Sequence, residues 1–308
     1  MTEDPPLPAS ARPGRLATLL ASLATTDGYN ATRLPGVKIM RSSRAILRSQ
    51  VSYSPSLVII AQGRKRGYLG ERIFTYDANH FLVLSVPLPF ECETLASPDG
   101  PLLGLSIEVE PTTVAKLLLS MKPPEFANVD PPDEAIRANP LDNTLYDAAV
   151  RLMEAIANSD EEAAILGPAI VREMLYRVLC GAGGGPLRLL ATPHSHVGRI
   201  SHTLQRLHAD FASPVNMAHL ATDAGMSLST FHEHFKAITG SPPLQYLKAI
   251  RLHKARLFML QQGDTAAAAA LKVGYESASQ FSREFKRYFG TTPAAEVSQL
   301  RANLMQPA

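Results

Sequence analysis

The chain has 308 residues, of which 45% are hydrophobic and 19% charged, and its formal net charge is +2. This composition is that of a soluble globular protein with room for two domains that have cores of their own. The longest apolar runs fall far short of the roughly 20 residues that cross a membrane, and the acidic, proline-rich start is unlike a secretory signal. Cys92 and Cys180 are too few for a disulfide framework or a structural zinc site, so we expect a reduced, cytoplasmic setting.

Residues from about 37 to 110 alternate apolar and polar positions in short runs, such as SLVIIAQG, HFLVLSV and PLLGLSIEVE. Turn residues separate these runs, which is the pattern of short β-strands. About seven or eight such runs at roughly ten-residue spacing predict an all-β barrel or sandwich. The run RKRGYLG, after Gln62 and Gly63, is typical of a hairpin with a basic tip.

From Pro111 to about residue 180 the pattern becomes helical, with the segments TTVAKLLLSM, LDNTLYDAAVRLMEAIA and EEAAILGPAIVREMLYRVL. The apolar stripes of the last two segments suit either packing on the barrel or pairing with a second copy of the chain. Residues 181–196, GAGGGPLRLLATPHSH, have the composition of a linker.

A repeat lies beyond the linker: GMSLSTFHEHFKAITGSPP, from Gly225 to Pro243, returns as GYESASQFSREFKRYFGTTP, from Gly274 to Pro293. Each copy has a glycine turn, a small polar N-cap, a helix with two spaced phenylalanines and a glycine stop. An Ala-rich helical segment precedes each copy, so we predict two tandem helix-turn-helix units. The residues expected in their cores are Leu220, Phe231, Phe235, Ile250, Leu271, Phe281, Phe285 and Phe289.

The basic residues are concentrated in this repeated part. Residues 199–308 hold 12 Lys or Arg against 7 Asp or Glu, whereas the remainder of the chain holds 18 against 21. The excess is modest, and it is consistent with contact to a phosphate backbone without demonstrating it.

The two repeat copies and the segment between them, SPPLQYLKAIRLHKARLFML, resemble the DNA-binding domain of the AraC/XylS family of bacterial transcription regulators. The stretch SPSLVIIAQGRKRGYLGERIFTYDANHFLVLSVPLP is similar to the cupin-like domain of the subgroup with the AraC-type N-terminal domain. The resemblance implies an α+β protein with several domains. Residues 1–180 would form a cupin-like β-barrel with a helical extension, for ligand binding and dimerisation. Residues 197–308 would form an all-α domain with two helix-turn-helix motifs joined by a long helix.

The joining helix sets how the two motifs reach DNA. It is expected from Leu244 to Gln262, and nineteen residues at about 1.5 Å each span roughly 28 Å. Two recognition helices enter successive major grooves on one face of DNA when they lie roughly 34 Å apart. One chain is therefore expected to contact two short elements about ten base pairs apart.

The resemblance also implies which side chains contact DNA. Arg283 can donate two hydrogen bonds to guanine and Gln280 can pair with adenine, whereas Glu233 departs from the basic or amide residue of many relatives. Lys236, Lys286 and Arg287 are expected on backbone phosphate. The positions matching the family's base-reading residues are Ser229, Thr230, His232, Glu233, Ser279, Gln280, Ser282 and Arg283. The ending AAEVSQLR after Pro293 departs from the broad family and is similar to that of the subgroup.

The predicted barrel is not expected to hold a metal or to catalyse a reaction. His80 is the only histidine before residue 194, so the three-histidine site of metal cupins cannot be built there. We expect no cofactor and no catalytic residue. The remaining role is binding a small molecule, and the candidate pocket residues are Tyr53, Gln62, Tyr76, His80 and Phe90. Cys92, between Glu91 and Glu93, is expected to be a buried structural cysteine in preference to a sensor thiol.

These observations predict a transcription regulator that binds double-stranded DNA at specific sequences. Its control is expected to come from a small-molecule effector bound in the barrel. A homodimer is expected, with RNA polymerase as a further partner if the protein is an activator. One alternative is a regulator without an effector, whose barrel serves only for assembly. The other alternative is a metal cupin enzyme fused to a DNA-binding domain.

Overall fold

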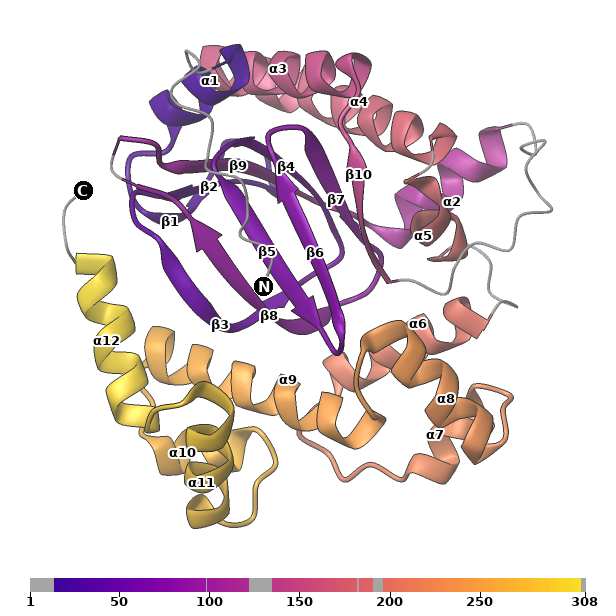
Figure 1. Cartoon of the computed structure of the whole chain (residues 1–308). Coiled ribbons are helices and arrows are strands. Elements are labelled where there is room, and N and C mark those ends of the chain that lie inside the picture. The colour runs from indigo at the N-terminus through magenta and orange to yellow at the C-terminus, as the bar shows by residue number, and fades with distance from the viewer. Residues whose placement is uncertain (1–13, 98, 122–134, 182, 191–195, 306–308) are drawn as a thin grey trace.

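The computed structural model describes residues 14–97, 99–121, 135–181, 183–190 and 196–305. Its first half contains two antiparallel sheets that face each other (Figure 1). The six-stranded sheet has the order β1 (Gly28–Ala31), β2 (Val37–Ser42), β9 (Leu102–Glu108), β4 (Ser56–Gln62), β7 (His80–Leu84) and β10 (Ile136–Pro140). The four-stranded sheet has the order β3 (Ile46–Tyr53), β8 (Leu88–Leu95), β5 (Arg64–Leu69) and β6 (Arg72–Asp77).

The predicted strand region and fold class are confirmed, since β2 to β9 fill residues 37 to 108. The sequence pattern missed β1 and β10, which lie outside that region. The strands form two facing sheets instead of one closed barrel: among the described residues, no ladder joins β3 or β6 to the larger sheet. The pairing of β4 becomes irregular between Ile60 and Gln62, and the chain then crosses from one sheet to the other.

The larger sheet is buried on both faces. Because side chains alternate along a strand, Leu57 and Ile59 of β4 point to one face, and Val58 and Ile60 point to the other. The first pair belongs to a core beneath three helices, α1 (Arg15–Leu23), α3 (Asn143–Asn158) and α4 (Asp160–Cys180). The second pair faces the smaller sheet.

Helices α3 and α4 bury the apolar stripes that the sequence predicted, so packing on the sheet accounts for most of these residues. Their buried members are Leu145, Ala149, Leu152, Ile156, Ile170, Met174, Leu175 and Val178. Ile165 of α4 was expected in the same stripe but is 66% exposed. Asp142 caps α3 through the Leu145 amide, and Ser159 caps α4 through the Glu162 amide.

Residues 181–196, expected to be a linker, are only partly irregular. Gly184–Leu190 forms the short helix α5, which packs against α4 and β7 and buries Leu187 completely. Gly183 and Gly184 lie close against Phe81 and Leu179, positions where a larger residue would collide. Residues 191–195 lie outside the described part, and α6 (His196–Ala209) follows. The glycines therefore permit close packing here.

The second half is helical and holds both predicted helix-turn-helix units. The first unit is α7 (Met217–Asp223) and α8 (Leu228–Thr239), and the second is α10 (Ala266–Lys272) and α11 (Ala278–Phe289). Ser227 and Ser277 accept hydrogen bonds from the amides of Thr230 and Gln280, both at 3.2 Å. The joining helix is α9 (Pro243–Leu257), whose last turn is the π-helical segment η1 (Phe258–Gln262), and α12 (Pro293–Met305) contains the divergent ending.

Two apolar cores meet along α9. Tyr246, Leu247 and Ile250 pack with Phe231 and Phe235 of the first unit, in a cluster that also contains the inward faces of both sheets. Leu252, Ala255 and Met259 pack with Phe281 and Phe285 in a separate cluster.

Leu271 was expected in the second core but is 69% exposed. Ala269, Ala270 and Val273 take the inward positions of α10, and the small alanines let this helix approach α9 closely. The longest apolar side chain of the segment therefore points to solvent.

Arg251 of α9 donates hydrogen bonds to backbone carbonyl oxygens beside both units. Its Nε donates to Phe211 O at 2.7 Å and its Nη2 donates to Ser213 O at 2.9 Å, in the connection that precedes α7. Its Nη1 donates to Gly274 O at 3.3 Å, in the turn of the second unit. One guanidinium thus positions the entry to the first unit and the turn of the second.

The sheets and the helical half also meet at Tyr246 of α9, which is fully buried. Its hydroxyl donates to Pro87 O at 2.5 Å, just before β8, and lies 2.9 Å from Nε2 of His208 on α6. Burial lowers the pKa of His208 to about 4, with a smaller contribution from the charge of Lys254. The imidazole is therefore neutral at pH 7. Among the described residues, we find no helix of the length and hydropathy that a membrane crossing requires.

Replacement of Gly274 and of Gly290 by alanine should differ in cost. Both residues have a φ of +81°, so each substitution carries the left-handed strain of about 1–2 kcal/mol. A Cβ at Gly274 would lie 2.1 Å from Ala212 O, whereas a Cβ at Gly290 has nothing within 4 Å. We expect Gly274→Ala to lower the free energy of unfolding by at least about 2 kcal/mol more than Gly290→Ala, measured by urea denaturation. Equal losses would contradict this packing.

Acid should destabilise the protein through His208. In the unfolded chain this histidine takes up a proton near pH 6.5, whereas the folded protein resists protonation down to about pH 4. Stability is therefore lost as the pH falls through this window, by roughly 2 kcal/mol between pH 7 and 5. His208→Gln keeps a donor for Tyr246 but cannot titrate, so its urea unfolding should depend less on pH. An unchanged pH dependence in this variant would show that His208 is not responsible.

Candidate functional site

The predicted DNA-contacting residues of the first unit lie on the solvent side of α8. Phe231 and Phe235 bury the opposite side, so the helix presents a polar face. Four of the predicted residues on this face are exposed, and Thr230 is half-buried; the exposed ones are Ser229, His232, Glu233 and Lys236. The hydroxyl of Ser229 lies 3.1 Å from that of the N-cap Ser227.

The second unit has the same arrangement on α11, where Phe281 and Phe285 form the buried side. Ser279, Gln280, Arg283 and Lys286 are exposed, and Ser282 is half-buried with its hydroxyl donating to Ala278 O at 2.9 Å. The side-chain nitrogen Nε2 of Gln280 donates to Oε1 of Glu284 at 3.2 Å. Arg283 forms no hydrogen bond or ion pair with any described residue, so its guanidinium is available to a ligand.

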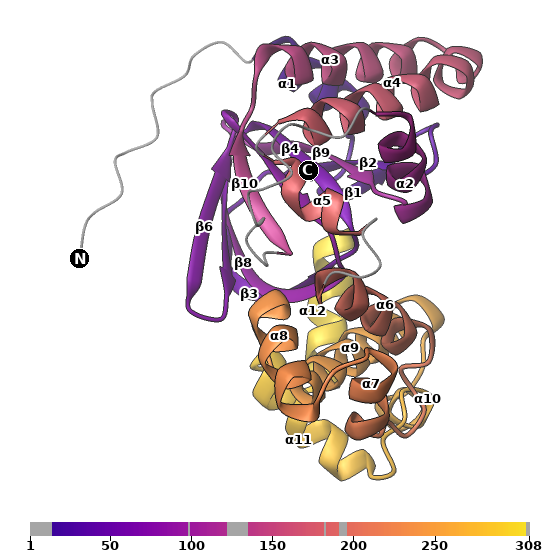
Figure 2. The ribbon, with the colours of Figure 1, turned by 90° about the vertical axis from the view of Figure 1, so that its right-hand side faces the viewer.

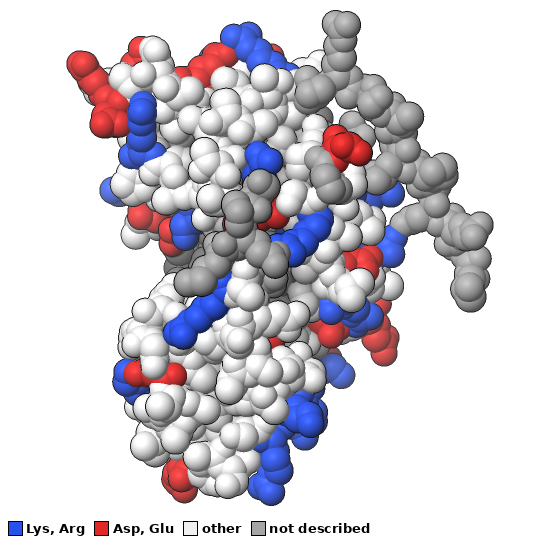
Figure 3. Space-filling view, turned by 90° about the vertical axis from the view of Figure 1, so that its left-hand side faces the viewer, with Lys and Arg blue, Asp and Glu red and all other residues white. Residues whose placement is uncertain are grey.

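The two recognition helices, α8 and α11, lie on one side of the helical half. Figure 2 shows both of them on the same side of α9, with α7 and α10 on the other side. Basic side chains accompany this arrangement: Figure 3 shows Lys and Arg together along the lower right edge of the helical half. Placement on one side is a condition that both helices must meet to enter neighbouring major grooves of one duplex.

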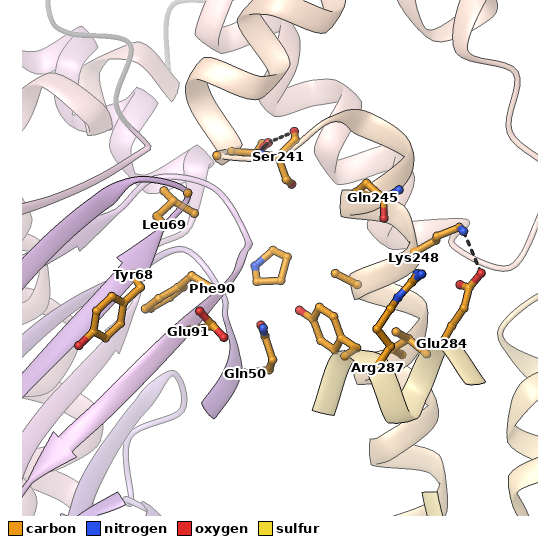
Figure 4. Close-up of a pocket in the computed structure, with 17 residues that line it drawn as sticks. Gln50, Tyr68, Leu69, Phe90, Glu91, Ser241, Gln245, Lys248, Glu284 and Arg287 are labelled. Atoms are coloured by element: carbon orange, nitrogen blue, oxygen red, sulfur yellow. Dashed lines mark hydrogen bonds and ion pairs between the residues drawn. The ribbon is translucent and has the colours of Figure 1, made fainter. Parts of the chain in front are cut away.

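Arg287, one turn beyond Arg283, is also exposed, and it borders the β-sheets. It lines a cavity of about 350 Å³ between the helical half and the smaller sheet, together with Gln245 and Lys248 of α9 (Figure 4). Glu284 lies on the same wall, where it accepts a hydrogen bond from Lys248 Nζ at 2.9 Å and another from the Tyr275 hydroxyl at 2.9 Å. The sequence pattern did not predict this cavity, because its walls come from segments that are distant in the chain.

Three of the five predicted pocket residues lie between the sheets. The rings of Tyr53 and Phe90 meet edge to face with centroids 5.1 Å apart, and the Tyr76 hydroxyl lies 3.7 Å from Sγ of Cys92. All four side chains are buried, Cys92 included. Burial raises the pKa of both Tyr53 and Tyr76, so their phenols stay protonated.

Gln62 and His80 do not join this group. Gln62 follows the irregularity in β4, and its amide donates to Pro101 O at 2.9 Å. His80 begins β7 beside a turn, with Nδ1 2.8 Å from Oδ1 of Asp77 and 38% of its side chain exposed. Within the described residues, no three His, Cys, Asp or Glu side chains are grouped to hold a metal ion.

A cavity of about 180 Å³ lies between the sheets beside these aromatic residues. Tyr53 and Cys92 form part of its wall, and Tyr29 and Ile46 lie on its open side, where β1 and β3 form the edges of the two sheets. Lys65 of β5 also lines it and was missed by the sequence analysis. The signal that could have found Lys65 is the alternation of β5, which turns every second side chain inward.

Comparison with known proteins agrees with this architecture. Residues 33–186 match the family model described as AraC-type transcriptional regulator N-terminus, and residues 220–298 match a helix-turn-helix domain. The HTH-type transcriptional activator RhaS of Escherichia fergusonii is 33% identical over 108 residues, which cover 35% of this chain and 38% of RhaS. A putative AraC-like transcription regulator of Streptomyces lividans is 38% identical over 94 residues, 30% of this chain and 31% of that protein. The matched part thus spans about a third of the length of these relatives.

Among solved structures, ToxT from Vibrio cholerae with a bound unsaturated fatty acid has a TM-score of 0.60 at 12% identity, covering 85% of this chain and 93% of ToxT. A single-substitution variant of apo ToxT has the same TM-score and identity, covering 88% of this chain and 99% of that one. At 12% identity, the similarity to ToxT shows a shared fold and nothing more. The family model spans half of the chain and the second match covers the helix-turn-helix region, so this protein belongs to the AraC/XylS family of transcriptional regulators, in the subgroup with the AraC-type N-terminal domain.

Proposed function

We propose that the chain is a sequence-specific regulator of transcription that binds double-stranded DNA and is not an enzyme. The observation that carries this proposal is the pair of recognition helices, α8 and α11, held on one side of a single joining helix with their polar faces in solvent. Such a pair fits two neighbouring major grooves. Residues 197–308 would contact DNA, and residues 1–180 would regulate that contact.

Base recognition is assigned chiefly to α11. Arg283 has its full set of donors available and can form two hydrogen bonds with guanine. Gln280 can pair with adenine after leaving Glu284, which keeps its bonds from Lys248 and Tyr275. In α8, the carboxylate of Glu233 suits the amino group of a cytosine, and His232 lies beside it on the exposed face.

Phosphate contact is assigned to Lys236 and Lys286, which are exposed in the last turn of each recognition helix. Arg287 was expected to share this role. It is exposed and also lines the cavity between the two halves, so it could contact phosphate only at the end of α11 that borders the smaller sheet. These lysines would position the protein on DNA without selecting its sequence.

Regulation is assigned to a small molecule bound between the sheets. The intersheet cavity opens to solvent, and the core that surrounds it is continuous with the core of the first helix-turn-helix unit. An occupant that shifts Tyr53 would also press on Phe90, which lines the cavity facing α9 and α11. This contact path supports control of DNA binding by an effector.

Self-association is assigned to the outer face of α4. Ile165, Leu166 and Tyr176 are 66%, 46% and 47% exposed on this helix, while its other face packs on α3. An apolar face of this kind fits a homodimer related by a two-fold axis. If the protein is an activator, RNA polymerase would be a further partner.

Selection of bound DNA from random sequence tests the assignment of Arg283. Arg283→Ala should cost about 1–3 kcal/mol in binding and relax the preference at one base pair, in only one of the two elements. Lys286→Ala should weaken binding to all sequences alike and reduce the dependence on salt. If the full-length Arg283→Ala protein selects the same motif as the wild type, Arg283 does not read a base.

Sedimentation of the full chain tests the dimer. Ile165→Glu should weaken self-association at least about tenfold, because it would bury an unpaired carboxylate in an apolar contact, equivalent to roughly 1.4 kcal/mol. Ile73→Glu is the matched control, since Ile73 of β6 is 64% exposed on a different surface. A monomeric wild type, or equal effects of the two changes, would rule out this face of α4.

A further inference from the structure

The cavity between the sheets contains a buried cation without a counter-charge. Lys65 lies in β5 and is only 9% exposed. Its neighbours Arg64 and Arg66 point to the outer face, where they pair with Asp77 at 3.7 Å and with Glu93 at 3.0 Å. Nζ of Lys65 forms no hydrogen bond or ion pair with any residue that the structure describes. The side chain is therefore largely buried, and its charge has no anionic partner among the described residues.

The surroundings of Lys65 offer aromatic and hydroxyl groups but no carboxylate. Nζ lies 5.7 Å from the centroid of the Tyr53 ring, and Tyr29 lines the same cavity. Thr94 and Tyr76 are its ladder neighbours on β8 and β6. None of the described residues that line the cavity is an Asp or a Glu.

The nearest charged groups on the surrounding strands are already matched. Arg41 of β2 also lines the cavity; it forms an ion pair with Asp27 at 3.8 Å and its Nη1 donates to Ala24 O at 3.2 Å, although its buried Nε donates no hydrogen bond. Glu91 of β8 pairs with Arg48. Lys65 is thus the cation for which an anionic partner must come from outside these strands.

The shape of the cavity limits the size of that partner. The volume of about 180 Å³ slightly exceeds that of an engineered apolar cavity, roughly 150 Å³, that holds benzene. Met40, Val51 and Leu102 supply apolar walls. Tyr29 and Ile46, on β1 and β3, flank the open side, so a ligand can enter without opening a ladder.

From this arrangement we propose that the intersheet cavity binds a small organic monocarboxylate of about six to ten heavy atoms. The carboxylate would pair with Lys65 and accept hydrogen bonds from the phenols of Tyr29 and Tyr53, and the apolar body would fill the space beside Met40 and Leu102. The proposal deepens the assignment of an effector site in this half of the protein and rests on it for its biological role.

Calorimetric titration of the full chain with hexanoate, benzoate and phenylacetate tests the proposal, with hexanamide, benzamide and phenylacetamide as neutral counterparts. At least one acid should bind, and its amide should bind at least tenfold more weakly. Lys65→Met should weaken the binding of that acid at least tenfold, whereas Lys38→Met, on the exposed side of β2, should leave it unchanged. Val51→Trp, which fills the cavity, should also abolish binding and serves as the second variant if Lys65→Met does not fold.

Three results would overturn the proposal: that none of the acids binds, that acid and amide bind equally, or that Lys65→Met binds as the wild type does. Measurement of DNA binding by the same proteins distinguishes failure of the ligand proposal from failure of the proposed function. Lys65→Met should still bind the selected DNA, but the acid should no longer change its affinity. DNA binding without any response to acids in the wild type would leave the regulator assignment standing and remove the ligand assignment alone.

Discussion

Both helix-turn-helix units depend on one helix, α9, whose apolar residues are shared between their cores. Its first half packs under Phe231 and Phe235, and its second half packs under Phe281 and Phe285. Arg251 lies between the two and binds backbone carbonyls on both sides, so neither unit can turn about α9 without breaking hydrogen bonds to a guanidinium. The recognition helices therefore keep one mutual orientation, which is the condition for reading two grooves of one duplex.

The two sheets contact the helical half at a small number of positions. Tyr246 of α9 donates its hydroxyl to Pro87 O, beside the strand that carries Phe90. Phe90 touches Tyr53 in the intersheet cavity and also lines the cavity that faces Arg287 of α11. The rings of Tyr53 and Phe90 thus connect Lys65 with the cavity that borders the second recognition helix. These contacts extend from the intersheet cavity to the wall of the cavity that borders α11, and the same core also contains Phe231 and Phe235 of the first unit.

Periodicity in the sequence predicted the elements well, because strand alternation and the repeated helix pattern are local signals. The joining helix, expected from Leu244 to Gln262, runs from Pro243 to Gln262 with a π-helical end. Features that depend on partners distant in the chain were missed. Leu271 is exposed because alanines occupy the contact with α9, and the tip of the β5–β6 hairpin is at Gly70 and not at the basic run. The burial of Lys65 follows only from the register of β5 against its neighbours.

The division of the apolar cores has a thermodynamic consequence. The interior of the sheets and the first helix-turn-helix unit share one core, whereas the second unit has a core of its own that begins near Leu252. The boundary between cooperative folding units therefore falls inside α9, and not between residues 186 and 220, where the two family-model matches are separated. Heat should melt the second unit as an independent step, while the first persists with the β-structure to which it is fused.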